Sequence, residues 1–177
     1  ILCAERLMAE GKADESVEIY DEVRKAEVPK QKALEATRGA ILARKSQGVP
    51  LLIEQLRSDD RAFFRLGLST AREVAGREVA DALAGELIRA TPERAALLLA
   101  AFADLSDSVP SAVLEVAKSG PKPVRIAAIG VVGRLGDTSS LSTLLEIAGE
   151  SDAELAQSAK AALSGLPGEK INGELLG

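Results

Sequence analysis

Residues 124–137 read VRIAAIGVVGRLGD and hold three glycines, Gly130, Gly133 and Gly136, among aliphatic side chains. Glycines at such spacing occur in phosphate-cradling loops and also on the faces of closely packed helices. A dinucleotide-binding fingerprint needs a strand before the glycines and a helix after them. Here the glycines lie within and at the end of a helix-like apolar run. We therefore expect Gly130 and Gly133 to let neighbouring helices approach, and Gly136 to end a helix in the left-handed conformation.

This run belongs to a pattern that recurs along the chain. An apolar residue near the end of a helix-like segment returns at a nearly constant interval, at Leu42, Val74, Leu105, Leu135 and Leu166. A leucine lies at one fixed offset beyond each of them, at Leu51, Leu83, Leu114, Leu144 and Leu175. Each period reads as a helix, a tight turn and a second helix, with prolines at the boundaries between helices, at Pro50, Pro110, Pro121 and Pro123. Such periods indicate stacked helical hairpins.

The two helices of one period differ in their apolar surface. Around Ile129, apolar side chains surround much of the helix, which predicts neighbours on both flanks. The next segment, residues 139–150, is predicted to bury one stripe, formed by Leu141, Leu144, Leu145 and Ala148 at i, i+3, i+4 and i+7. No convincing strand is found, so the predicted fold class is all-α.

Several positions carry signals for the start of a helix. Ser151–Glu154 has the spacing of a capping box, and Thr91–Pro92 places a capping residue before proline at the first helical position. Adjacent residues at a helix start point in different directions, so we interpret Asp59–Asp60 as capping groups rather than as paired catalytic carboxylates.

The stretch from Pro123 to Asp137, followed by Leu141, Leu144 and Leu145, resembles the repeat of HEAT proteins, in particular the short bacterial HEAT-like or phycobilisome-lyase-type repeats. The resemblance covers residues 30–176 and is loosest near its start. The unit at residues 92–120 departs from it, with Leu-Ser-Asp in place of Leu-Gly-Asp and no Val-Arg opening. The resemblance implies an α-solenoid of the HEAT/armadillo kind, a right-handed α-α superhelix of stacked helical hairpins, over residues 29–177.

Residues 1–28 resemble a tetratricopeptide-like helical hairpin, because Gly11, Ser16 and Tyr20 have the spacing found in that family. We expect this hairpin to stack on the HEAT-like repeats and to extend one continuous solenoid. The sequence begins at Ile1 without a methionine and stops at Gly177 just after two leucines. We interpret it as a fragment of a longer chain with other domains, which leaves its localisation open.

The composition restricts the chemistry of the chain. Histidine, the commonest general base and metal ligand, is absent, and aromatic residues are only 2% of the sequence. Cys3 is the one cysteine, and alone it forms neither a zinc site nor a disulfide within the chain. We therefore expect no catalytic residue, no cofactor and no metal. No apolar run approaches the roughly 18–20 residues that span a bilayer, so we expect a soluble chain without membrane insertion.

The charge is unevenly distributed. Residues 1–136 hold 20 Lys+Arg against 20 Asp+Glu, whereas residues 137–177 hold 2 against 7. A neutral body with an acidic end is not the electrostatic footprint of a nucleic-acid-binding protein, and exposed aromatic platforms for stacking bases are not expected either.

Three classes of function are compared on these grounds. The favoured one is a non-catalytic protein–protein interaction scaffold that binds a protein or peptide, or that positions other domains of its parent chain. The resemblance to HEAT-like proteins also suggests a bilin lyase-like subunit that handles a tetrapyrrole, or a nucleic-acid-processing protein. The lack of histidine and the scarcity of aromatic residues count against the tetrapyrrole, and the acidic balance counts against nucleic acid.

In HEAT solenoids the second helix of each hairpin lines the concave surface, where partners bind. The positions of these helices that face away from the leucine stripe are the candidate partner-binding residues: Glu54, Arg57, Asp81, Glu86, Glu115, Lys118, Ser142 and Glu146.

Arg125 occupies the position where HEAT-like repeats often carry an arginine that reaches an aspartate of a neighbouring turn. We expect it to form a ladder between repeats with Asp137 or Asp107, and we expect Arg65 to be its counterpart. This interpretation gives both arginines a structural role rather than a role in binding a ligand.

Overall fold

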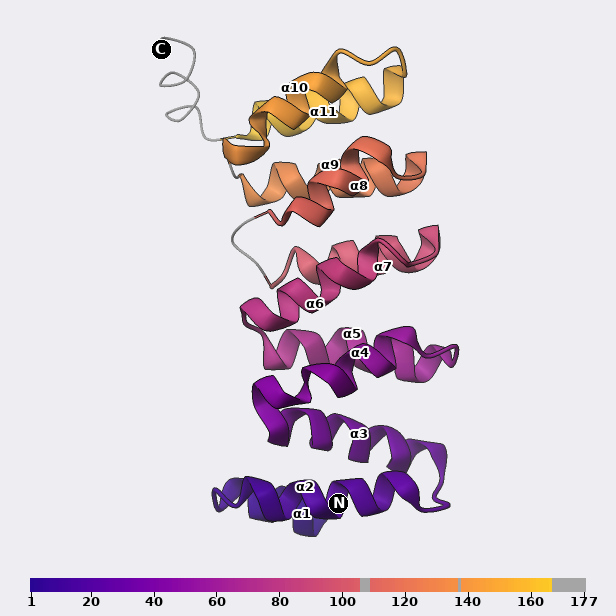
Figure 1. The fold of residues 1–177 in the computed structure, drawn as a ribbon, viewed down its shortest axis with the longest axis vertical. Helices are drawn as coiled ribbons and strands as arrows, with labels where there is room; N and C mark the ends of the chain where they lie inside the picture. The colour runs from indigo at the N-terminus through magenta and orange to yellow at the C-terminus, as the bar shows by residue number, and fades with distance from the viewer. Residues whose placement is uncertain (106–108, 137, 167–177) are drawn as a thin grey trace. The chain divides into compact units, whose positions relative to one another are not determined.

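The computed structural model describes residues 1–105, 109–136 and 138–166 (Figure 1). These residues form helices and turns and include no strand, which confirms the all-α fold class. The chain folds as two compact units, residues 1–82 and 83–177.

The helices of the first unit are α1 (Leu2–Ala9), α2 (Ala13–Lys25), α3 (Lys30–Arg44), the 3-10 turn η1 (Lys45–Gly48), α4 (Val49–Arg57) and α5 (Arg61–Val74). The boundary between the units falls within α6 (Arg77–Leu87). The helices of the second unit are α7 (Pro92–Phe102), α8 (Ser111–Ser119), α9 (Lys122–Leu135), the 3-10 turn η2 (Thr138–Ser140), α10 (Leu141–Ala148) and α11 (Ala153–Gly165).

The period found in the sequence is visible in the helix boundaries. Helices α3, α5, α7, α9 and α11 begin at Lys30, Arg61, Pro92, Lys122 and Ala153, so that successive starts are evenly spaced along the chain. The apolar residues that mark the period in the sequence, from Leu42 to Leu166, each lie at or near the end of one of these helices. Leu175, the last of the second series of leucines, lies outside the described residues.

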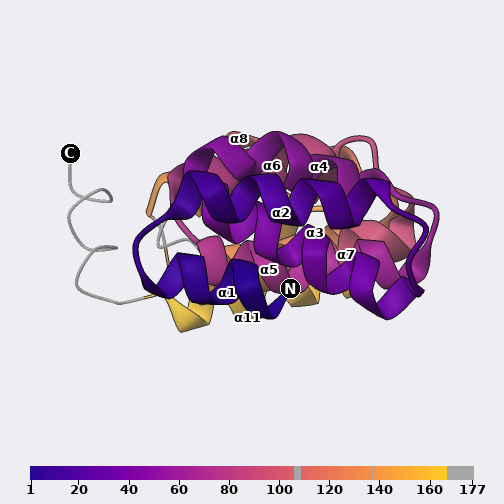
Figure 2. The ribbon, with the colours of Figure 1, turned by 90° about the horizontal axis from the view of Figure 1, so that it is seen from below.

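Within the first unit, α3 occupies the centre of the packing. It contacts α1 and α2 on one flank and α4 and α5 on the other, and α4 also packs against α5. Figure 2 shows α1 and α2 as neighbouring helices of one hairpin. The first helix of one hairpin, α3, therefore packs directly on the first helix of the next, α5.

The second unit repeats this scheme. Helix α9 packs against α7 and α11, and also against α8, the second helix of the preceding hairpin. Helix α10 packs against α8 and α11. First helices thus contact first helices, and the second helices α8 and α10 contact each other.

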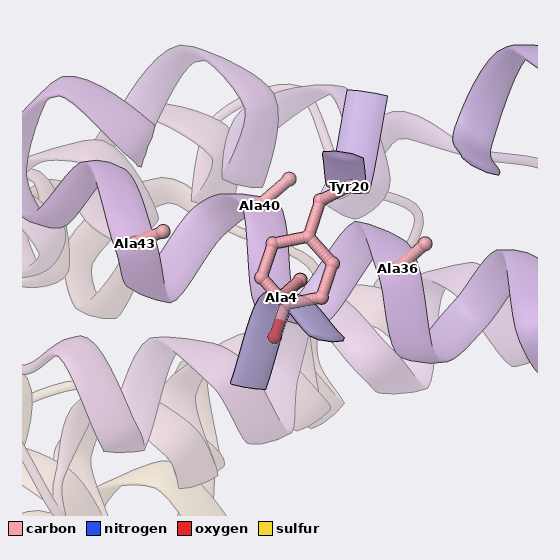
Figure 3. Packing of buried hydrophobic residues seen from close by; sticks show 5 residues of the cluster. All are labelled: Ala4, Tyr20, Ala36, Ala40 and Ala43. Carbon is pink, nitrogen blue, oxygen red and sulfur yellow. The ribbon is translucent and has the colours of Figure 1, made fainter. Parts of the chain in front are cut away.

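Tyr20 fills the core of the first unit and is 4% exposed. Its ring lies among the side chains of Ala4, Ala36, Ala40 and Ala43, which come from α1 and α3 (Figure 3). A Cβ added to Gly39 of α3 would lie 2.3 Å from the ring atom Cζ of Tyr20. The absence of a side chain at Gly39 therefore allows α3 to approach the aromatic ring.

The other two residues of the tetratricopeptide-like spacing also have local structural roles. Gly11 has φ +78° in the turn between α1 and α2, a conformation that favours glycine. Ser16 is fully buried, and its hydroxyl donates a 2.9 Å hydrogen bond to the carbonyl oxygen of Ala4. A small residue at this position lets α2 lie close to α1.

The glycines of residues 124–137 differ in their roles. Gly136 has φ 64° and ψ 25° and ends α9 in the left-handed conformation, as predicted. A Cβ added to Gly133 would lie 2.8 Å from the Cβ of Ala162 in α11, which confirms that Gly133 is a packing residue. The prediction is wrong for Gly130, because that position is exposed and a Cβ there would meet no atom within 4 Å.

Two further sequence predictions need correction. Leu145 is 56% exposed rather than part of the buried stripe of α10, whose buried residues are Thr143, Leu144 and Ile147. The cap of α11 is Asp152 rather than Ser151, and its side chain accepts hydrogen bonds from the backbone N–H groups of Glu154 and Leu155. The buried face of α10 is therefore rotated relative to the predicted stripe, and the cap of α11 lies one residue later than the sequence suggested.

Other start signals are confirmed. Asp60 caps α5 and accepts a hydrogen bond from the backbone N–H of Ala62. Thr91 precedes α7 and Pro92 is its first residue, although the Thr91 side chain makes no capping hydrogen bond.

The two helical glycines of α9 provide a matched pair of substitutions. Gly133→Ala should lower the free energy of unfolding by about 1–3 kcal/mol, because the new methyl group overpacks the contact with Ala162. Gly130→Ala should raise it by about 0.5–1 kcal/mol, because alanine favours the helix and meets no neighbour. Urea denaturation of both variants measures the difference, and equal effects at the two positions would contradict the assigned packing.

Candidate functional site

The second helices of the second unit present an exposed surface that contains four of the eight predicted partner-binding residues. Glu115 and Lys118 lie on α8, Ser142 and Glu146 lie on α10, and all four are exposed. Because α8 and α10 pack together, these residues belong to adjacent helices. Leu145, which is also exposed, lies on α10 between Ser142 and Glu146. We name the surface formed by these five residues the α8–α10 face.

One ion pair connects the two helices across this face. The Nζ atom of Lys118 lies 2.8 Å from Oε2 of Glu146, and both side chains remain largely accessible to water. An exposed pair of this kind contributes little to stability, typically about 0.2–1 kcal/mol. Both residues were predicted from the sequence as partner-binding positions, but their pairing was not. Leu145 was predicted to lie in the buried stripe.

Of the other four predicted partner-binding residues, three are exposed and one is buried. Glu54 and Arg57 of α4 and Asp81 of α6 are exposed, and Asp81 lies 3.8 Å from Arg77 in an ion pair along its own helix. Glu86 is only 9% exposed, so its predicted place on an accessible surface is wrong. Glu86 follows the buried Leu83 at the i+3 position and therefore shares its face of α6, a signal that the sequence already contained.

Arg125 links three segments of the second unit. Its Nε atom donates a 2.7 Å hydrogen bond to the carbonyl oxygen of Ala117 near the end of α8. Its Nη2 atom donates a 2.5 Å hydrogen bond to Oε1 of Glu150, in the turn after α10. The arginine therefore bridges to a neighbouring turn, with a glutamate as its acidic partner. Asp107 and Asp137, the partners expected from the sequence, lie outside the described residues.

Arg65, the expected counterpart of Arg125, is exposed on α5. In the first unit, two arginines of α3, Arg38 and Arg44, connect this helix to its neighbours. Arg38 pairs with Glu73 of α5, and Arg44 pairs with Asp21 of α2. Burial acts to raise the pKa of Asp21, but hydrogen bonds from Arg44 and Arg24 outweigh it and lower that pKa.

A lysine–aspartate pair recurs in both units at the same place in the hairpin scheme. The Nζ atom of Lys30, the first residue of α3, lies 2.5 Å from Oδ2 of Asp60, which caps α5. The Nζ atom of Lys122, the first residue of α9, lies 2.9 Å from Oδ2 of Asp152, which caps α11. In each pair the aspartate follows the lysine by the same interval, close to one period of the chain. These pairs were not predicted from the sequence, although a lysine about one period before a capping aspartate could have indicated them.

These pairs shift the pKa values of their members. The hydrogen bond from Lys30 lowers the pKa of Asp60, and the backbone N–H of Ala62 adds to the effect. The hydrogen bond from Lys122 lowers the pKa of Asp152 in the same way, while Asp152 and then Glu154 raise the pKa of Lys122. A carboxyl whose pKa is lower in the folded state stabilises the fold above its unfolded pKa. That stabilisation is lost as the pH falls through the folded value.

The variant Asp60→Asn/Asp152→Asn tests this effect, because asparagine keeps a capping oxygen but carries no charge. We expect its melting temperature to be a few degrees below that of the parent chain at pH 7, and the difference to shrink progressively as the pH falls below the ordinary pKa of aspartate, because both folded pKa values are lowered. Thermal melts followed by circular dichroism from pH 2.5 to 7 provide the measurement. Glu18→Gln, an exposed change on α2, should leave the melting temperature unchanged at both ends of this range.

Each unit contains at least one pocket. In the first unit, a largely apolar pocket of about 530 Å³ lies between the end of α3 and the turn from α5 to α6. In the second unit, a pocket of about 260 Å³ lies beside the α8–α10 face and includes Glu115 in its lining. Among residues 1–105, 109–136 and 138–166, no group of three or more His, Cys, Asp or Glu side chains is placed to bind a metal ion.

No helix in the described part of the chain combines the length and the apolar character needed to cross a membrane. No protein-family model matches the sequence, and the curated proteins include no match to it. The geometry described above is therefore the basis for a functional proposal.

Proposed function

We propose that the chain is a non-catalytic protein–protein interaction scaffold. Its helical hairpins are proposed to stack as an α-solenoid of the HEAT-like kind, with a tetratricopeptide-like hairpin at the N-terminus. A partner protein or peptide is proposed to bind the exposed faces of the second helices, and in the second unit the α8–α10 face.

Three features support the solenoid. Five helices, from α3 to α11, begin at a nearly constant interval along the chain. Within each unit, successive first helices pack on each other: α3 on α5, α7 on α9, and α9 on α11. An ion pair recurs in both units, as Lys30–Asp60 and Lys122–Asp152. In each pair the lysine begins one first helix and the aspartate caps the next. In repeat proteins each hairpin contacts mainly its neighbours, and equivalent contacts recur at the repeat spacing.

The observation that carries the binding proposal is the exposure of Leu145 on a helix that is packed on its other side. Leu145 is 56% exposed, while Leu144 and Ile147 of the same helix are fully buried. Exposed leucines are common on protein surfaces, but this one lies among charged and polar residues of two adjacent helices. An apolar residue surrounded by polar groups is the usual composition of an interface.

The aromatic side chains favour a protein partner over a tetrapyrrole or single-stranded nucleic acid. Tyr20, Phe64 and Phe102 are buried, and Phe63, the remaining aromatic residue, is half-buried. Bases and other flat ring systems are commonly held by stacking on accessible aromatic rings. The four aromatic residues of this chain serve mainly in its helix packing.

Deletion of residues 61–91 removes α5, α6 and the following turn and joins Asp60 directly to Pro92, where a helix again begins. For stacked repeats, the shortened chain should stay folded and helical, since each hairpin contacts mainly its neighbours. Its urea m-value should fall by about a sixth, in proportion to the residues removed.

Deletion of residues 61–76 is the control, because it removes α5 and leaves α6. After this deletion α6 directly follows Asp60, so a second helix stands where a first helix should pack. This shorter deletion should be much less stable than the deletion of a whole period. If both deletions unfold the chain equally, the solenoid proposal is refuted.

A photo-activated cross-linking residue at position 145 tests the proposed binding face in the cells that make the protein. We expect one or a few discrete protein adducts, which mass spectrometry would identify, because a partner seated on the α8–α10 face contacts this side chain. The same residue at Gln157, an exposed position on α11, should not capture them. Identical adducts at both positions, or none at position 145, would contradict binding at this face.

A further inference from the structure

The pocket beside the α8–α10 face has an unusual distribution of charge. It encloses about 260 Å³ and is lined by the end of α6, the start of α7, the end of α8 and the start of α9, all within the second unit. Its walls are part polar and part apolar, and the apolar part includes Leu87, Ile88, Val116 and Val124. Among the described residues that line it, Glu115 is the only one with an ionisable side chain.

The carboxylate of Glu115 has no ion-pair partner among the described residues, unlike the cations around it. Lys118 pairs with Glu146, Lys122 with Asp152 and Glu154, and Arg125 with Glu150. The nearby basic residues of α8 and α9 are therefore engaged elsewhere. Arg89 lies in sequence between two lining residues but does not itself line the pocket.

The backbone adds to the negative potential of the pocket. Both α6 and α8 end at it, and the C-terminal end of a helix carries a partial negative charge. The chain already places one cation at the end of α8, since Arg125 donates a hydrogen bond to the carbonyl oxygen of Ala117. The charge of that arginine is matched by Glu150, and no ion pair between Arg125 and Glu115 forms.

The shape and polarity of the pocket select the kind of cation. Sites for metal ions that prefer oxygen commonly combine several carboxylates, and Glu115 is the only carboxylate among the described residues that line this pocket. The side chains of lysine and arginine combine an apolar stem with a charged end. The stem can cover the apolar wall, including Ile88, which is 64% exposed, while the charged end reaches Glu115.

We propose that this pocket binds a lysine or arginine side chain of a partner peptide, with Glu115 as the acidic group that pairs with it. This inference rests on the proposed scaffold function and specifies the partner as a peptide that bears a basic residue. Glu115 then acts as an anchor for the peptide beside the α8–α10 face.

The pocket can be tested without knowledge of the partner by titrating the chain with N-acetyl-arginine amide. We expect saturable NMR shifts of the methyl groups of Ile88 and Val116, with a Kd of about 1–10 mM for so small a probe. N-acetyl-norleucine amide, which has a similar stem and no charge, should bind at least about tenfold more weakly.

Glu115→Gln should weaken binding of the arginine amide by about tenfold or more, because it removes the charge and leaves the pocket shape unchanged. Glu93→Gln, an equal change of charge at an exposed position of α7 that does not line the pocket, should leave the Kd within about twofold. Equal binding of the two amides, or an unchanged Kd in Glu115→Gln, would overturn the inference.

The result is separable from that of cross-linking at position 145. Discrete adducts at that position without binding of the arginine amide would keep the scaffold and refute the basic side-chain pocket. Binding of the amide that depends on Glu115, without adducts at position 145, would support the pocket and refute Leu145 as a contact of the partner.

Discussion

The close approach of neighbouring helices through small residues is the constraint on which the rest of the structure depends. Aromatic residues are rare in this chain, so helix packing relies on alanine, glycine and aliphatic side chains. Gly133 lies against Ala162 between α9 and α11, and Gly39 lies against the ring of Tyr20 between α3 and α2. Close-packed interiors respond to a change of a single methyl group. The spacing of the first helices, and with it the exposed surface of the second helices, depends on these contacts.

Charged residues complete this packing at the ends of the helices. The pairs Lys30–Asp60 and Lys122–Asp152 connect the start of one first helix to the cap of the next, and Arg125 connects the end of α8 to the turn after α10. Many of the basic side chains of α8 and α9 are engaged in this way. Glu115 differs, because it is the only ionisable side chain among the described residues that line its pocket and has no ion-pair partner among the described residues. This difference supports the assignment of Glu115 to recognition.

The candidate site could be predicted from the sequence only in part. Charged and polar positions of α8 and α10 were selected because they face away from a leucine stripe, and Glu115, Lys118, Ser142 and Glu146 are indeed exposed. The ion pair between Lys118 and Glu146 and the exposure of Leu145 were not predicted. Both depend on the rotation of each helix about its axis. The buried face of α10 is displaced by one residue from the predicted stripe, which corresponds to a rotation of about 100° about the helix axis.

The sequence by itself determined the all-α class, the regular period of the helices, the left-handed end of α9 at Gly136 and the cap at Asp60. These features are local, since they follow from backbone conformation, capping and the spacing of apolar residues along one helix. Only the tertiary structure decided that Gly133 packs and Gly130 does not, that Glu86 is buried, and that a pocket forms around Glu115. The physical reason is that each of these features depends on which atoms of another helix lie opposite the residue. The local sequence of one helix does not determine which residues of another helix will pack against it.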